Sequence, residues 1–99
     1  MMHSEQRWHS LSLAEQLGNT GSEYSRMVRN FKLNDTDKFR SALIRYLELL
    51  DFTLEDPRWS LARKRDLLRV REASCENFSD SFQKYFDQFA LLARRKNLH

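Results

Sequence analysis

Residues that interrupt helices are scarce in this chain, whose 99 residues include two glycines and one proline. That scarcity favours long, uninterrupted helices over a turn-rich β fold. A single cysteine, Cys75, excludes an intramolecular disulfide and is typical of a cytoplasmic protein. No apolar run approaches the roughly 18 to 20 residues that a membrane span needs, and the N-terminus has no apolar signal region. We therefore expect a cytoplasmic protein without a membrane segment.

Histidine is scarce as well, and His3, His9 and His99 all lie near the chain ends. A metal site needs ligands that converge from ordered elements, and the sequence shows no such convergence. A cysteine without a histidine partner is typical of a buried structural thiol and not of a nucleophile. We therefore predict no enzyme activity and no catalytic residue, and we expect no metal, cofactor or small-molecule ligand.

Apolar residues recur at spacings of three and four, the periodicity of amphipathic helices, most clearly between Phe39 and Leu54. Together with capping residues, this pattern predicts a flexible arm at 1–9 followed by helices near 12–31, 36–54, 58–76 and 80–95. Short polar turns between helices imply antiparallel neighbours. The prediction is one all-α domain, an antiparallel up-down-up-down four-helix bundle.

The first predicted helix begins with a capping box, Ser12 with Glu15. Small residues form a second stripe on it: Ala14, Gly18, Gly21 and Ser25. A glycine inside a helix costs about 1 kcal/mol relative to alanine, so two of them one turn apart indicate the close approach of another helix. The alternative is a break at 18–21 that gives two short helices; the continuous apolar phase favours one helix.

The third predicted helix begins with Asp56 as its cap and Pro57 in its first position. Its predicted core residues form two columns: Leu61, Leu68 and Cys75 in one, Leu67 and Phe78 in the other. Arg71 lies between these columns and needs an acid if it is buried. Glu23, Glu72 and Asp51 are the candidates, and the predicted buried ion pair is Arg71 with Glu23.

Arg58, Arg65 and Arg69 form a basic ridge on the outer face of the third predicted helix. The net charge of +3 is too small to indicate a nucleic-acid-binding protein by itself. A solvated face is the ordinary interpretation of such a ridge. The alternative is contact with phosphates, because charges at helical spacing can follow a nucleic-acid backbone.

Three apolar residues, Ile44, Phe52 and Leu91, point away from the predicted core. Single exposed apolar residues carry no meaning, whereas a cluster of them marks a surface for another subunit or partner. We therefore predict a non-enzymatic helical interaction module whose partner is protein, either a second copy of itself or another subunit of a complex. The alternative prediction is a small nucleic-acid-binding accessory protein that uses the basic third helix.

Four segments carry a resemblance to a known family: LAEQLGNTGSEYSR, ALIRYLELLDFTLEDPRW, LLRVREASCENF and QKYFDQFALLAR. With them the chain resembles a family of short bacterial and archaeal all-helical proteins that has no assigned activity. The resemblance covers most of the chain from Leu13 to Arg94, and it implies a helical fold without implying a function. In that family an acidic, aromatic loop follows the third helix, and the link at 77–80 is shorter here.

Overall fold

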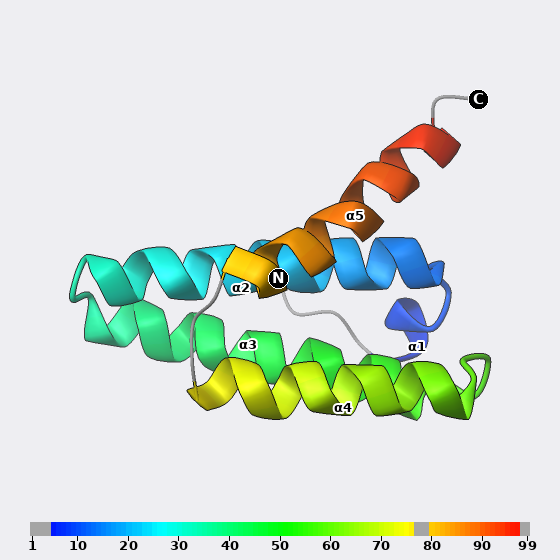
Figure 1. Ribbon diagram of the computed structural model, residues 1–99, viewed down its shortest axis with the longest axis horizontal. Coiled ribbons are helices and arrows are strands. Elements are labelled where there is room, and N and C mark those ends of the chain that lie inside the picture. Colours follow the sequence, from blue (N-terminus) through cyan, green and yellow to red (C-terminus); the bar gives the residue numbers. More distant parts are fainter. Residues whose placement is uncertain (1–4, 77–79, 98–99) are drawn as a thin grey trace.

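The computed structural model describes residues 5–76 and 80–97, apart from the side chains of 75, 76, 80, 81, 96 and 97. The described residues contain helices and no strand, which confirms the predicted all-α fold (Figure 1). The helices are α1 (Glu5–Trp8), α2 (Leu13–Lys32), α3 (Thr36–Glu55), α4 (Leu61–Glu76) and α5 (Asp80–Asn97). The flexible arm predicted at 1–9 is wrong for residues 5–8, because they form α1, and the side chain of Trp8 is fully buried against the rest of the chain.

Helix α2 begins at the capping box that the sequence predicts. The Glu15 backbone N–H donates to the Ser12 hydroxyl at 3.1 Å, and the Ser12 backbone N–H donates to the Glu15 carboxylate at 3.0 Å. The helix then continues without interruption through Gly18 and Gly21. The alternative of two short helices is therefore wrong. The chain reverses after α2 at Asn34, whose positive φ of 57° fits a tight turn.

Helices α2 and α3 lie side by side and run in opposite directions, and α4 runs back along α3 (Figure 1). Helix α5 crosses α2, and its C-terminal half leads away from the other helices. Aromatic side chains of three helices meet where α5 crosses. The ring centroid of Tyr24 lies 5.4 Å from that of Tyr46 and 5.8 Å from that of Phe86. This cluster forms the centre of the hydrophobic core.

The crossing of α2 and α5 depends on the two glycines of α2. A Cβ atom at Gly21 would overlap the Phe86 Cβ, and a Cβ atom at Gly18 would lie 3.0 Å from the Ala90 Cα. Gly21 therefore leaves no space for a side chain, and Gly18 leaves only a tight one, so the close approach of α5 to α2 depends on glycine at these positions. The predicted close helix contact is confirmed at the glycines; Ser25, the last residue of the predicted stripe, is exposed.

Helix α4 begins later than the sequence predicts. Asp56 does not cap a helix that starts at Pro57; its carboxylate accepts the backbone N–H of Arg58 at 3.0 Å and so shapes a turn. Ser60 takes the capping role, because its hydroxyl accepts the backbone N–H of Arg63 at 3.1 Å. Helix α4 therefore extends from Leu61 and not from residue 58.

Helix α4 presents only part of its predicted apolar face to the core. Leu61 and Leu68 are exposed, with 67% and 46% of their surface accessible, so the predicted core column that includes them is wrong. Leu67, from the other predicted column, is buried as predicted. Ser74 is buried as well, and its hydroxyl forms a hydrogen bond of 2.7 Å with that of Tyr46. The side chains of Cys75 and Phe78 lie outside the described residues.

Candidate interaction surfaces

A buried hydrogen-bond network joins the first turns of the chain to the end of α3. The Trp8 indole N–H donates to the Thr53 hydroxyl at 2.8 Å. The Gln16 amide donates to the Trp8 carbonyl oxygen at 2.8 Å and to the Asp56 carboxylate at 3.0 Å, and its oxygen accepts the Trp59 indole N–H at 2.9 Å. The side chains of Gln16, Thr53 and Asp56 are fully buried. Because each is hydrogen-bonded, the network stabilises the fold.

Arg58 belongs to this network and not to a basic ridge. Its Nη2 atom donates to the Asp56 carboxylate at 2.7 Å and to the Leu11 carbonyl oxygen at 2.6 Å, and its guanidinium lies 4.3 Å from the centre of the Trp59 ring. The prediction that Arg58 lines the outer face of a helix is therefore wrong. Hydrogen bonds from Arg58 hold the pKa of Asp56 well below its usual range, and those from Gln16 add to this effect.

Arg65 and Arg69 remain exposed on α4. Within the described part of the chain, neither side chain forms an ion pair or a hydrogen bond. Glu72 is exposed on the same helix, also without a partner among those residues. The outer face of α4, defined by Leu61, Leu68 and these three charged residues, thus combines exposed leucines with unpaired charges of both signs.

Arg71 pairs with an acid, but the acid is Asp51 of α3 and not Glu23. The Arg71 Nε atom lies 3.0 Å from an Asp51 carboxylate oxygen, and the two side chains are 34% and 46% exposed. The predicted buried pair is therefore wrong in its partner, and the observed pair is only partly buried. Glu23 instead accepts from Arg26 at 3.1 Å, and Arg45 lies 3.8 Å away. An accessible pair of the Arg71–Asp51 kind contributes about 0 to 1 kcal/mol.

A shallow polar hollow lies between α2 and α3 around Glu23. Its volume is about 260 Å³, and its lining includes the side chains of Arg26, Asn30, Lys38 and Arg45. The Glu23 carboxylate is nearly buried and is neutralised by the two arginines. Because the Arg26 and Arg45 side chains are 57% and 37% exposed, the lining is an ion-pair cluster that solvent can screen.

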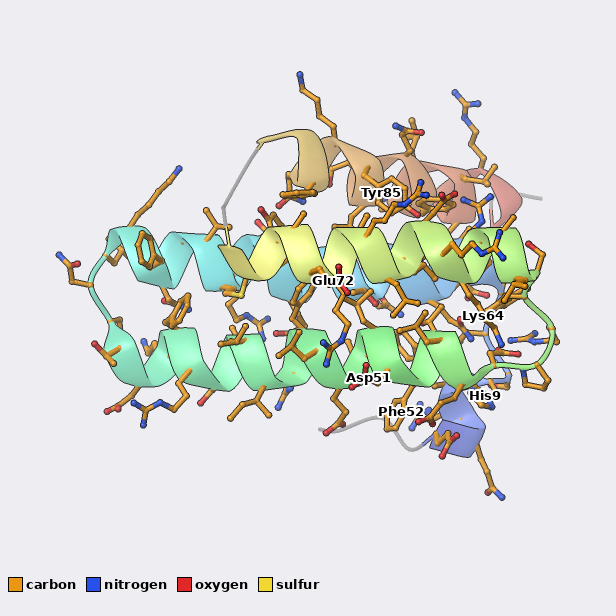
Figure 2. All side chains as sticks on the ribbon, turned by 60° about the horizontal axis from the view of Figure 1, so that its bottom comes forward. His9, Asp51, Phe52, Lys64, Glu72 and Tyr85 are labelled. Carbon is orange, nitrogen blue, oxygen red and sulfur yellow. The ribbon has the colours of Figure 1, made fainter. Side chains whose placement is uncertain are left out.

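The structure does not bring the three predicted interface residues together. Ile44 is 59% exposed on α3, and Leu91 is 52% exposed on α5. The inner faces of these two helices meet in the core, where the Tyr46 and Phe86 rings are 5.9 Å apart, so their outer faces do not form one surface. Phe52 is only partly exposed and lies beside His9, whose Nε2 atom is 2.9 Å from the Phe52 carbonyl oxygen (Figure 2).

Tyr85 is the one described residue with a buried side-chain polar atom that has no hydrogen-bond partner. Its hydroxyl lies between α5 and α4 (Figure 2). Burial raises the pKa of Tyr85, and the nearby Arg63 partly opposes that effect. A buried hydroxyl without a partner costs stability, so this position is a local weakness of the packing between α4 and α5.

Comparisons with family models, curated proteins and solved structures found no match to this chain. No group of three or more metal-ligating side chains gathers within residues 5–76 and 80–97. None of the helices described above has the length and apolar character to cross a membrane. Function must therefore be inferred from the surfaces of the chain itself.

Proposed function

We propose that this protein is a non-enzymatic helical interaction module that associates with a second copy of itself or with other subunits of a complex. The outer face of α4 carries this proposal. It exposes two leucines and three charged side chains that have no partner in the described part of the chain. Exposed apolar residues bordered by charged ones are typical of surfaces that bind other proteins.

The roles of the buried carboxylates support a non-enzymatic module. Asp56 is held by Arg58 and Gln16, and Glu23 is held by Arg26 and Arg45. A catalytic carboxylate needs a free proton-accepting or proton-donating position within reach of a substrate. Both acids are engaged in internal contacts, so their arrangement favours a structural role. The single cysteine keeps a cytoplasmic location as our expectation.

We propose, in addition, that the four long helices form an antiparallel up-down-up-down bundle. The opposite directions of α2 and α3, and of α3 and α4, support this topology. Helix α5, which crosses α2 at Gly18 and Gly21, is the fourth helix of this bundle. Such a bundle leaves the outer face of each helix available for a partner.

Sedimentation equilibrium at tens of micromolar tests self-association. We expect twice the monomer mass, with dissociation on dilution, because one helix face gives a small interface. A monomer mass at every concentration would contradict self-association. Phe52→Glu and Leu91→Glu are comparison variants at two of the interface positions that the sequence predicts. Neither residue lies on the outer face of α4, so both variants should leave the dimer intact.

Nucleic-acid binding is the second candidate function, and the exposure of Arg65 and Arg69 favours it. Without Arg58, the ridge holds only two arginines, which predicts weak binding. Affinity for a generic DNA duplex should appear at low salt and fall steeply as salt rises. Arg65→Glu and Arg69→Glu should each weaken that affinity. If no binding occurs at low salt, this second candidate is wrong.

A further inference from the structure

The two exposed leucines of α4 are spaced like residues of a helix-pairing seam. Leu61 and Leu68 lie seven residues apart, so they occupy the same side of the helix two turns from one another. At about 100° per residue, Leu61, Arg65, Leu68 and Glu72 fall within an arc of about 60°. The buried residues Leu67 and Ser74 face the core from the opposite side. This narrow stripe matches the face that one helix presents to another.

The charges on this stripe are arranged around Leu68. Arg65 lies three residues before it, and Glu72 lies four residues after it. Both side chains are exposed, and neither pairs with another described residue. Positive charge therefore lies toward the start of α4, and negative charge lies toward its end. Such a pattern is complementary to itself when a second helix of the same sequence runs in the opposite direction.

We propose that a second copy of this chain packs its own α4 antiparallel against this stripe, about a twofold axis beside Leu68. In this arrangement the two Leu68 side chains meet at the axis, and Arg65 faces the partner's Glu72 on both sides. A parallel arrangement would place Arg65 against the partner's Arg65, so charge selects the antiparallel one. An interface of this kind is isologous, the commonest type in soluble dimers. The inference rests on the proposed self-association and assigns its surface.

The effect of removing Arg69 distinguishes this dimer from a basic surface that binds nucleic acid. It lies beside the stripe, about 70° from its centre on the helical wheel, and next to Leu68 in the sequence. The twofold axis therefore places the two Arg69 side chains close together on one flank, where they repel each other. Removal of Arg69 should strengthen the dimer, whereas removal of Arg65 should weaken it. A nucleic-acid surface would lose affinity in both cases.

Charge exchange at Arg65 and Glu72 tests the arrangement. Arg65→Glu and Glu72→Arg should each raise the dimer dissociation constant about tenfold, because each variant replaces two attractive contacts with two repulsive ones. The double variant should return the constant to within about threefold of the original value, since the exchange restores both pairs. Sedimentation equilibrium at low salt measures all four proteins. A double variant no tighter than the weaker single variant would overturn the inference.

Arg69→Ala is the matched variant on the same helix, and it should lower the dissociation constant about twofold or more. Ile44→Glu alters an exposed apolar residue on α3 and should leave the constant unchanged. Circular dichroism confirms that each variant is folded. If the chain dimerises and only Ile44→Glu dissociates it, this surface is wrong while self-association stands. If the unaltered chain is monomeric, both proposals are wrong.

Discussion

Polar groups have opposite surroundings in two regions of this protein. Where α1 and α2 meet the end of α3, the side chains of Gln16, Thr53 and Asp56 are fully buried and each forms hydrogen bonds. On the outer face of α4, Arg65 and Glu72 are exposed and have no partner among the described residues. The first region is complete within one chain, whereas the second has charges and leucines available for another molecule.

The difference shows which region is informative about folding and which about association. A buried polar group without a partner costs about 1 to 3 kcal/mol, so a network in which every member is paired points to a role in stability. Exposed charges have little such cost, because water solvates them. We therefore expect changes to the internal contacts to lower folding stability and changes to the outer face of α4 to weaken association.

The largest loss of stability should come from Gly21→Leu at the crossing of α2 and α5. A side chain there would overlap Phe86, and overpacking of this kind costs about 3 kcal/mol. Ser25→Leu is the control on an exposed turn of the same helix and should change stability by less than about 0.5 kcal/mol. Denaturation by urea measures both. Equal stabilities of the two variants would show that the helices do not approach closely at Gly21.

A smaller loss is expected for Asp56→Ala in the buried network. The change removes the acceptor for Gln16 and Arg58 and should cost about 2 kcal/mol. The cost stays below that of a fully buried pair because the Arg58 side chain is partly exposed and can turn toward water. Asp66→Ala, on the exposed side of α4, is the control and should have little effect. A thermal unfolding midpoint for Asp56→Ala equal to that of Asp66→Ala would contradict the structural role of the network.

Acid should weaken the same network. The pKa of Asp56 is lowered from its ordinary value of 3.8 in the folded protein, so the folded state binds its proton less readily than the unfolded state. The stabilisation is therefore complete above about pH 5 and is lost as the pH falls through 4 and below. Asp56→Asn removes the titrating group, and its stability should depend less on pH in this range. Urea denaturation between pH 3 and about pH 6 measures how steeply the stability of each protein changes with pH. Equal pH dependence of Asp56→Asn and the unaltered chain would contradict this prediction.

The smallest predicted change in folding stability is a gain and not a loss. Tyr85→Phe removes a buried hydroxyl that has no partner and should stabilise the fold by up to about 1 kcal/mol. Tyr46→Phe removes a hydroxyl that bonds to Ser74 and should destabilise it by about 1 kcal/mol. Thermal unfolding of the two variants should move the midpoint in opposite directions. A fall in both midpoints would mean that the Tyr85 hydroxyl is paired in solution.

The sequence predicted the features that depend on neighbouring residues. The capping box at Ser12, the continuity of α2 and the close contact at Gly21 follow from local spacing and side-chain size. Helix α4 was more difficult because apolar residues occur on two sides of it. In the observed orientation of α4, Ser74 forms a hydrogen bond with Tyr46, and Arg71 pairs with Asp51.

The buried network was missed for a related reason. Gln16 and Asp56 are 40 residues apart in the sequence, so no local pattern links them. The available signal was the position of Gln16 and Thr20 on the inward side of α2, one turn apart. The hydrogen bonds from Arg58 to Asp56 likewise depend on the turn between α3 and α4, which the sequence did not predict. The candidate surface on α4 depends on the exposure of Leu61 and Leu68, which the sequence assigned to the core.

Disulfide trapping at the twofold axis tests the proposed surface most directly. Cys75→Ser removes the native thiol, and Leu68→Cys then places a single cysteine beside the axis. Mild oxidation at tens of micromolar should give a covalent dimer, because the two Cα atoms would lie within the roughly 4.4 to 6.8 Å that a disulfide requires. Leu91→Cys in the same background keeps the α4 interface but should give no covalent dimer over that time. Rapid cross-linking through Leu91→Cys, with none through Leu68→Cys, would contradict the α4 interface.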